Sequence, residues 1–239
     1  MNSLAALLVL GRILIPINYS GPGAFGADWL TQVLVENLSG SDLRQPGASF
    51  RVICSADEGC VSDTIATGSI GYLDTPAPGG FILDHVNSGD SDGVFASVRI
   101  ATGARSVLTG GTSIPIARDS DFRSEIVLPL VPSASFDRPV RAMIRIYSLD
   151  APDGAVARVS FRSHTFEAPF PFPDVPVRLS RPLGSPLFPA YAAADLFAVL
   201  QGRGAFGSLR VKAPEGSRIW VLVTLTDNVT NEVTAITPH

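Results

Sequence analysis

One stretch of the sequence matches the nucleophile motif of a large class of hydrolases. Residues 89–93 read Gly-Asp-Ser-Asp-Gly, a G-x-S-x-G pattern in which Ser91 would attack a carbonyl carbon. Such a serine needs a strained turn between a strand and a helix, together with a histidine base that a carboxylate orients. The bases that the sequence offers are His85 and His164, and nothing in their spacing places either one beside Ser91.

The surroundings of this motif favour a simple turn. A strand is predicted before it at residues 81–86 and another after it at residues 94–100, so the motif has no helix to begin and no parallel sheet to carry it. Asp, Ser and Gly are typical turn residues. We therefore interpret the motif as a hairpin turn and predict that the chain is not an enzyme. A serine hydrolase at Ser91 is the alternative.

The sequence predicts no metal site and no cofactor. Residues 87–93 carry oxygen ligands that suit calcium, but they lack the terminal glutamate of an EF-hand loop. The three histidines, His85, His164 and His239, have no metal-ligand spacing with one another or with a cluster of carboxylates.

The two cysteines predict a disulfide. Cys54 and Cys60 flank Ser-Ala-Asp-Glu-Gly, a turn-forming segment that would bring the two sulfur atoms together. A bridge that closes so short a loop contributes roughly 2 kcal/mol and persists only in an oxidising compartment. The alternative is a pair of free thiols in a cytosolic protein.

Four aromatic residues are candidates for a binding surface. Phe170 and Phe172 lie within residues 166–176, where four prolines favour an extended chain. Their rings would either form an apolar ridge for a partner or cover the open end of a sandwich. Trp29 and Tyr19 are of the types that stack on sugars, which is the basis of an alternative as a carbohydrate-binding module.

The composition excludes two classes of partner. Among 239 residues only 17% are charged and 46% are hydrophobic, so the chain is expected to fold around a sizeable core. The net charge is −4 and no basic cluster is present, which argues against nucleic-acid binding. No apolar run approaches the ~20 residues that cross a bilayer. Residues 1–11 are expected to be either a signal-peptide remnant or an edge strand.

Strand periodicity dominates the rest of the chain. In residues 30–37 alternate side chains are apolar or small, and in residues 140–149 Ala142, Ile144 and Ile146 alternate with Arg141 and Arg145. This period of two with one charged face is typical of an antiparallel sheet that is packed on one side and solvated on the other. One helix is predicted, at residues 192–200.

An internal repeat predicts two domains. Ile-Leu-Ile-Pro-Ile at residues 13–17 returns as Ile-Val-Leu-Pro-Leu at residues 126–130, and both halves close with a strand, a turn and a short apolar segment before a proline. The repeat is near the size of an immunoglobulin domain. We predict two tandem immunoglobulin-like antiparallel β-sandwiches, at residues 12–118 and 119–239, joined by a short polar connector.

The motifs that carry this repeat also resemble a known group of proteins. Three segments carry the resemblance: residues 13–17, residues 20–29 with their glycines and Trp29, and the closing segment at residues 219–230. They resemble uncharacterised secreted proteins of acidobacteria-like and other environmental bacteria, which are built from tandem β-sandwich repeats. The resemblance implies a bacterial protein outside the cell or at its surface. It implies no activity. We expect a non-enzymatic structural or binding module whose partner is an extracellular protein or polysaccharide.

Overall fold

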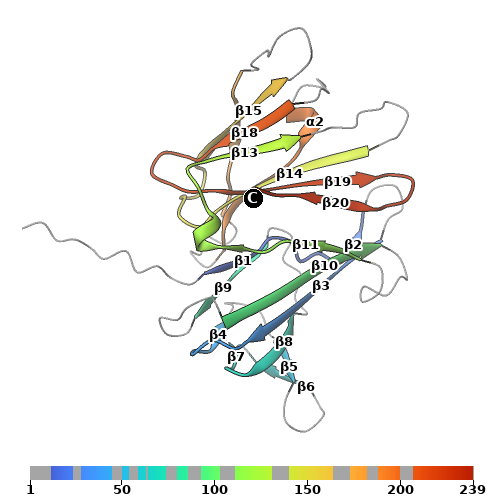
Figure 1. Cartoon of the computed structure of the whole chain (residues 1–239), viewed down its shortest axis with the longest axis vertical. Coiled ribbons are helices and arrows are strands. Elements are labelled where there is room, and N and C mark those ends of the chain that lie inside the picture. Colours follow the sequence, from blue (N-terminus) through green and yellow to red (C-terminus); the bar gives the residue numbers. More distant parts are fainter. Residues whose placement is uncertain are drawn as a thin grey trace, which may run out of the picture.

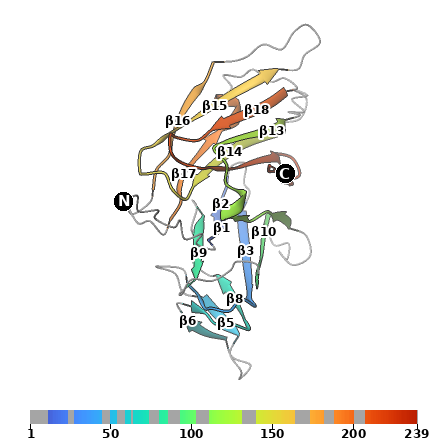
Figure 2. The same ribbon diagram turned by 60° about the vertical axis from the view of Figure 1, so that its left-hand side comes forward.

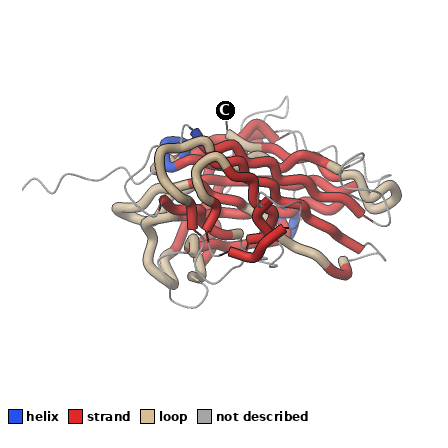
Figure 3. The backbone as a smooth tube through the Cα atoms, turned by 90° about the horizontal axis from the view of Figure 1, so that it is seen from below, coloured by secondary structure: helices blue, strands red, loops and turns tan. Residues whose placement is uncertain are grey.

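The computed structural model of the chain is built almost entirely of β-strands (Figures 1 and 3). The all-β class predicted from the sequence is confirmed. The structure describes residues 12–23, 28–44, 50–53, 59–62, 64–73, 80–85, 93–102, 111–130, 140–163, 173–181, 188–199 and 207–238.

The strands of the first half form two antiparallel sheets. One sheet has the order β12-β1-β9-β4-β7, and the other has the order β11-β10-β3-β8-β5-β6 with β2 paired beside β3. The bounds of these strands are β1 (Ile13–Ile15), β2 (Gly21–Pro22), β3 (Asp28–Asn37), β4 (Leu43–Arg44), β5 (Phe50–Ile53), β6 (Gly59–Ser62), β7 (Thr64–Ile65), β8 (Ser69–Leu73), β9 (Phe81–His85), β10 (Val94–Thr102), β11 (Thr112–Ile114) and β12 (Ala117–Arg118).

The strands of the second half form two four-stranded antiparallel sheets, ordered β13-β18-β15-β16 and β17-β14-β19-β20. A short 3-10 helix, η3 (Asp119–Asp121), connects β12 to this half. The bounds of its elements are β13 (Glu125–Leu130), β14 (Val140–Ser148), β15 (Val156–Ser163), β16 (Val175–Arg178), β17 (Ala190–Asp195), α2 (Leu196–Val199), β18 (Gly207–Lys212), β19 (Trp220–Asp227) and β20 (Val233–Ile236).

The two sheets of the second half pack face to face around one core. Ala142, Ile144 and Ile146 of β14 are buried in it, as the alternation in the sequence predicts. The facing sheet contributes Val159 and Phe161 of β15 to the same core. Side chains that alternate inward from two sheets into a shared core define a sandwich-like arrangement.

A second core extends from the first half into the second half. It contains the predicted β1 run at residues 13–15 and buried side chains of β3, β9 and β10, and it also takes in Tyr147, Trp220 and Leu222 of the second half. Trp220 is therefore a core residue, and it lies where the halves meet. In Figure 2 the two halves lie one above the other, with β1, β2 and β9 below β14 and β17.

The two halves have the same strand order in the sheets that approach each other. The first half contains the run β11-β10-β3-β8 and the second half contains the run β20-β19-β14-β17. The edge strands β11 and β20 of these two sheets meet (Figure 1), and the Thr112 hydroxyl donates a hydrogen bond of 2.8 Å to the carbonyl oxygen of Val233. The predicted boundary between residues 118 and 119 falls between β12, which pairs with β1, and η3.

One short helix is present in the second half, as predicted, but the predicted extent of residues 192–200 is wrong. Residues 190–195 form β17, where Ala192 and Ala194 pair with Ile146 and Ile144 of β14, and only residues 196–199 are helical. Alanine favours a helix in isolation, but the backbone pairing with a buried strand outweighs that propensity. The helix begins after Asp195, whose carboxylate accepts hydrogen bonds from the backbone N–H groups of the second and third residues that follow it, at 2.8 and 3.2 Å.

Candidate functional site

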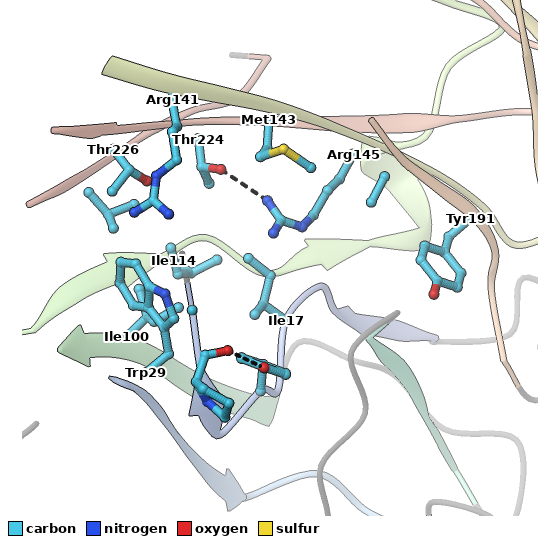
Figure 4. Close-up of a pocket in the computed structure, with 15 residues that line it drawn as sticks. Ile17, Trp29, Ile100, Ile114, Arg141, Met143, Arg145, Tyr191, Thr224 and Thr226 are labelled. Carbon is cyan, nitrogen blue, oxygen red and sulfur yellow. Dashed lines mark hydrogen bonds between the residues drawn. The ribbon is translucent and has the colours of Figure 1, made fainter. Parts of the chain in front are cut away.

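A cavity lies between the two halves of the molecule (Figure 4). Its volume is about 480 Å³, which is within the range of small-ligand sites. Its lining comes from β2, β3, β10 and β11 on one side and from β14, β17, β19 and β20 on the other. Neither half forms this cavity alone, so its shape depends on how the halves are held together.

The wall from the first half carries two of the predicted binding residues, Tyr19 and Trp29. Both line the cavity and both are partly exposed. Tyr19 is held by its backbone, because its N–H donates to the hydroxyl of Thr31 at 3.1 Å and its carbonyl accepts from the same hydroxyl at 2.7 Å. Its phenol donates to the carbonyl oxygen of Pro22 at 2.7 Å, so the ring closes over the short strand β2.

Trp29 is placed by a glycine. The pairing of β2 with β3 sets Gly21 opposite Trp29. A Cβ atom on Gly23 would lie 2.1 Å from Nε1 of Trp29, so with any larger residue at this position the indole ring would have to move. Gly23 therefore lets the backbone approach the indole ring closely, and the ring lies against this wall of the cavity beside Ile100 (Figure 4).

The wall from the second half is cationic. Arg141, Met143 and Arg145 project from one face of β14 into the cavity, with Thr224 and Thr226 beside them on β19 (Figure 4). Nη1 of Arg145 donates a hydrogen bond of 2.9 Å to the hydroxyl of Thr224. Nε and Nη2 of Arg141 are shielded from solvent. No aspartate or glutamate is among the described residues that line the cavity.

The position of these arginines corrects the prediction that one face of β14 is solvated. The face with Arg141 and Arg145 does alternate with the core face, but it faces the first half across the cavity. A signal for this was present in the neighbouring strand β19, whose residues 220–224 are buried on both faces. A strand that is apolar on both faces indicates a sheet that is covered on both sides.

A network of ion pairs joins the two halves. Asp119, which is only 7% exposed, lies between Arg12 and Arg218, with N···O distances of 3.3 and 2.8 Å. Asp150 accepts from the same two arginines at 3.1 and 3.2 Å. Arg12 precedes the first strand of the first half, whereas Asp150 and Arg218 belong to the second half, so the network joins the halves.

One further hydrogen bond, donated by Tyr147, ties the halves together, and Arg181 makes another within the second half. The phenol of Tyr147 donates to the backbone carbonyl of Pro16, and its ring packs at 6.3 Å from Tyr191 and 6.0 Å from Trp220. Burial raises the pKa of the Tyr147 phenol far above its ordinary value. Arg181 donates to the carbonyl oxygen of Ala151 at 2.7 Å, and burial together with the charge of Arg12 lowers its pKa.

Several predicted site residues fall outside the described residues. These are Cys54, Ser91, His164, Phe170, Phe172 and His239. For Cys60 and His85 the structure describes the backbone. Cys60 pairs with Val52 across the hairpin of β5 and β6, and His85 is the last residue of β9. The disulfide, the serine hydrolase and the phenylalanine ridge therefore stay predictions.

A group of metal ligands and a membrane-spanning helix are both absent from the described part of the chain. Within it, no three His, Cys, Asp or Glu side chains come together as metal ligands. No helix in the same part of the chain is long and apolar enough to cross a membrane.

Comparisons of the chain with protein-family models, with curated proteins and with solved structures find no match.

Proposed function

We propose that the chain is a non-enzymatic module outside a bacterial cell, in which two immunoglobulin-like sandwiches form one rigid unit that docks to an extracellular protein or polysaccharide. The observation that carries this proposal is the core shared by the two halves, in which Tyr147, Trp220 and Leu222 pack against strands of the first half. Domains that move independently have smaller and more polar interfaces. A fixed pair of sandwiches suits a role in spacing or display.

The sequence repeat and the strand order support a duplicated immunoglobulin-like unit. The matching runs β11-β10-β3-β8 and β20-β19-β14-β17 fit the repeated motifs at residues 13–17 and 126–130. In the second half, β17 pairs with β14 and β18 pairs with β15, which corresponds to the B–E and C–F pairs of immunoglobulin domains. The last strands differ from that fold, because β19 joins β14 and not β18.

Rigidity is tested with the full chain in solution. We expect its small-angle scattering profile to match the profile calculated from one fixed arrangement of the halves. In a Trp29→Phe variant, Trp220 is the remaining tryptophan and reports on the interface between the halves. Its fluorescence and the circular dichroism of all strands should then show the same unfolding midpoint. An interface that opens before the strands unfold, or a profile that requires several arrangements, would contradict the proposal.

The location outside the cell is tested through the cysteines. We expect no thiol of the native protein to react until a reductant is added, and the mass under non-reducing conditions to match a Cys54–Cys60 bridge. If both thiols react in the native protein, the extracellular part of the proposal is wrong. The fixed arrangement of the halves is tested separately by the scattering experiment.

A carbohydrate-binding module is the second candidate function, because Tyr19 and Trp29 line the same cavity. Aromatic rings beside polar side chains are typical of small-ligand sites. Retardation of the protein in gels that contain dissolved polysaccharides tests this function, with Trp29→Phe as the variant that should migrate freely. Equal retardation of the wild-type protein and the variant would place any polysaccharide contact elsewhere.

A further inference from the structure

The two walls of the cavity differ in chemistry, and the difference indicates the kind of ligand that would bind there. The wall from the first half offers the face of Trp29 and apolar side chains, Ile17, Ile100 and Ile114. The wall from the second half offers the guanidinium groups of Arg141 and Arg145. A ligand that fills the space must therefore meet an apolar surface on one side and positive charge on the other.

The charge of the cavity is one-sided. Two guanidinium groups enter it from alternate positions of β14, and the described lining contains no carboxylate. Groups of like charge in a partly enclosed space, with low-dielectric walls, focus their field on whatever enters. Guanidinium groups donate charge-assisted hydrogen bonds to carboxylates and phosphates, so an oxyanion is the chemistry that best matches this wall. Arg145 supplies the donors, whereas Arg141, whose Nε and Nη2 are shielded from solvent, adds its positive charge.

The polar groups between the arginines and the rings suit a hydroxylated ligand. Thr224 and Thr226 line the cavity next to the arginines, and the Thr224 hydroxyl already orients Arg145. That hydrogen bond uses one of the five N–H donors of the guanidinium group. Figure 4 shows the side chains of Arg141 and Arg145 directed toward the wall that holds Trp29 and Ile114. An oxyanion on a hydroxylated ring would meet the arginines, the threonines and the indole at once.

We propose that the cavity between the two halves binds an acidic sugar, a hexose-sized ring that carries a carboxylate or a phosphate group, with the oxyanion on Arg145, near the charge of Arg141, and the ring face on Trp29. The size of the cavity accommodates such a ring with its substituents. This inference goes beyond a role in spacing or display, and it shares with that role the fixed arrangement of the halves that forms the cavity. It also differs from general carbohydrate binding, because it requires a negative charge on the ligand.

The test compares three ligands that share one ring: galacturonate, galactose 6-phosphate and neutral galactose. Binding is followed through the indole N–H signal of Trp29 in a nitrogen-15 NMR titration, with the signal of buried Trp220 as the internal reference. A Trp29→Phe variant assigns the two signals. We expect one or both acidic sugars to shift the Trp29 signal with a Kd of ~1 mM or below, and galactose to bind at least about tenfold more weakly. The two acidic sugars distinguish a carboxylate from a phosphate.

Substitutions of the arginines test the source of the charge preference. Arg145→Met keeps the length of the side chain without its charge and donors, and it should weaken binding of the preferred acidic sugar by about tenfold. Arg141→Met removes a nearby charge and should weaken binding by a smaller factor. Arg145→Lys keeps the charge and loses the planar donors, so its affinity should fall between those of the wild-type protein and Arg145→Met. Arg158→Met, at an exposed position on the other sheet, is the matched control and should bind as the wild-type protein does.

The outcomes separate this inference from the others. If galactose shifts the Trp29 signal as strongly as the acidic sugars and the arginine variants bind equally well, the site is a neutral sugar site and the inference is wrong. It is also wrong if no acidic sugar shifts the signal at ~10 mM, which is sufficient to detect a Kd of ~1 mM. Raised salt should weaken binding of the acidic sugars in the wild-type protein, which tests the charge requirement even if a variant does not fold. None of these outcomes bears on the scattering test of rigidity.

Discussion

The phenol of Tyr147 joins the two halves, and its removal is a direct test of the interface between them. The ring is fully buried and its hydroxyl donates to the backbone carbonyl of Pro16, which is buried as well. Tyr147→Phe keeps the ring and its contacts with Tyr191 and Trp220 but leaves that carbonyl without this donor. A buried acceptor that loses its partner costs about 1–3 kcal/mol, so we expect the free energy of unfolding at neutral pH to fall by about 1–2 kcal/mol.

The pH dependence of this difference tests the same environment in a second way. Burial raises the pKa of Tyr147 far above its ordinary value of 10.0. Below that ordinary value the phenol is protonated in both the folded and unfolded states, so its contribution to stability is fully present. As the pH rises further, the unfolded state ionises first and the folded state loses stability, by up to about 1.4 kcal/mol per pH unit. The phenylalanine variant has no such loss.

The two proteins should therefore converge in stability in alkaline solution. The difference between them should shrink by about 1 kcal/mol between about pH 10 and about pH 11. Urea unfolding followed by circular dichroism measures both stabilities, and comparing the two proteins cancels the titration of all other groups. Tyr72→Phe, at a partly exposed position on β8, is the control and should change stability at neutral pH by less than about 0.5 kcal/mol. Parallel pH profiles for the wild-type protein and Tyr147→Phe would refute the buried, hydrogen-bonded phenol.

Two further predictions concern the interface and one of the tight turns. Asp119→Asn removes the buried charge between two arginines and should lower the free energy of unfolding by about 1–3 kcal/mol. Glu125→Gln, in an exposed ion pair, should change it by less than about 0.5 kcal/mol, and equal losses in urea unfolding would contradict the role of the network. Gly80 and Gly216 have φ angles of 72° and 71°, but only at Gly80 would a Cβ atom collide with backbone, 2.5 Å from the carbonyl oxygen of Ile15. Gly80→Ala should therefore cost more than about 3 kcal/mol and Gly216→Ala about 1 kcal/mol in thermal unfolding. Equal losses for the two variants would contradict the close packing of the turn before β9.

The alternation of side chains was sufficient to predict much of the fold. Because successive residues of a strand point to opposite faces, the inward positions of β3, β14 and β15 follow from the sequence, and the buried residues Val33, Ile144 and Val159 agree with them. The repeated segment before a proline marked the first strand of each half, now β1 and β13. The helix prediction was wrong in extent because alanines carry no periodic signal of their own and adopt the strand that β14 imposes on them.

Some residues of the candidate site could be predicted from the sequence, whereas their arrangement depends on the three-dimensional structure. Trp29 and Tyr19 were singled out by residue type. Nothing in the sequence showed that these rings face Arg141 and Arg145, which are more than 100 residues away along the chain and were predicted to face solvent.

The sequence pattern determined which side chains lie on the inner face and which on the outer face of each strand, because the alternation is a property of neighbouring residues. Only the tertiary structure decided whether the outer face of each sheet contacts solvent or the other half of the protein. The charged face of β14 would be solvated in a single sandwich, and it lines a cavity here because Trp220 and Leu222 on β19 bury themselves against the first half. The free energy of burying apolar surface between the halves thus places two arginines opposite an indole, an arrangement that contacts between sheets create and that no local pattern encodes.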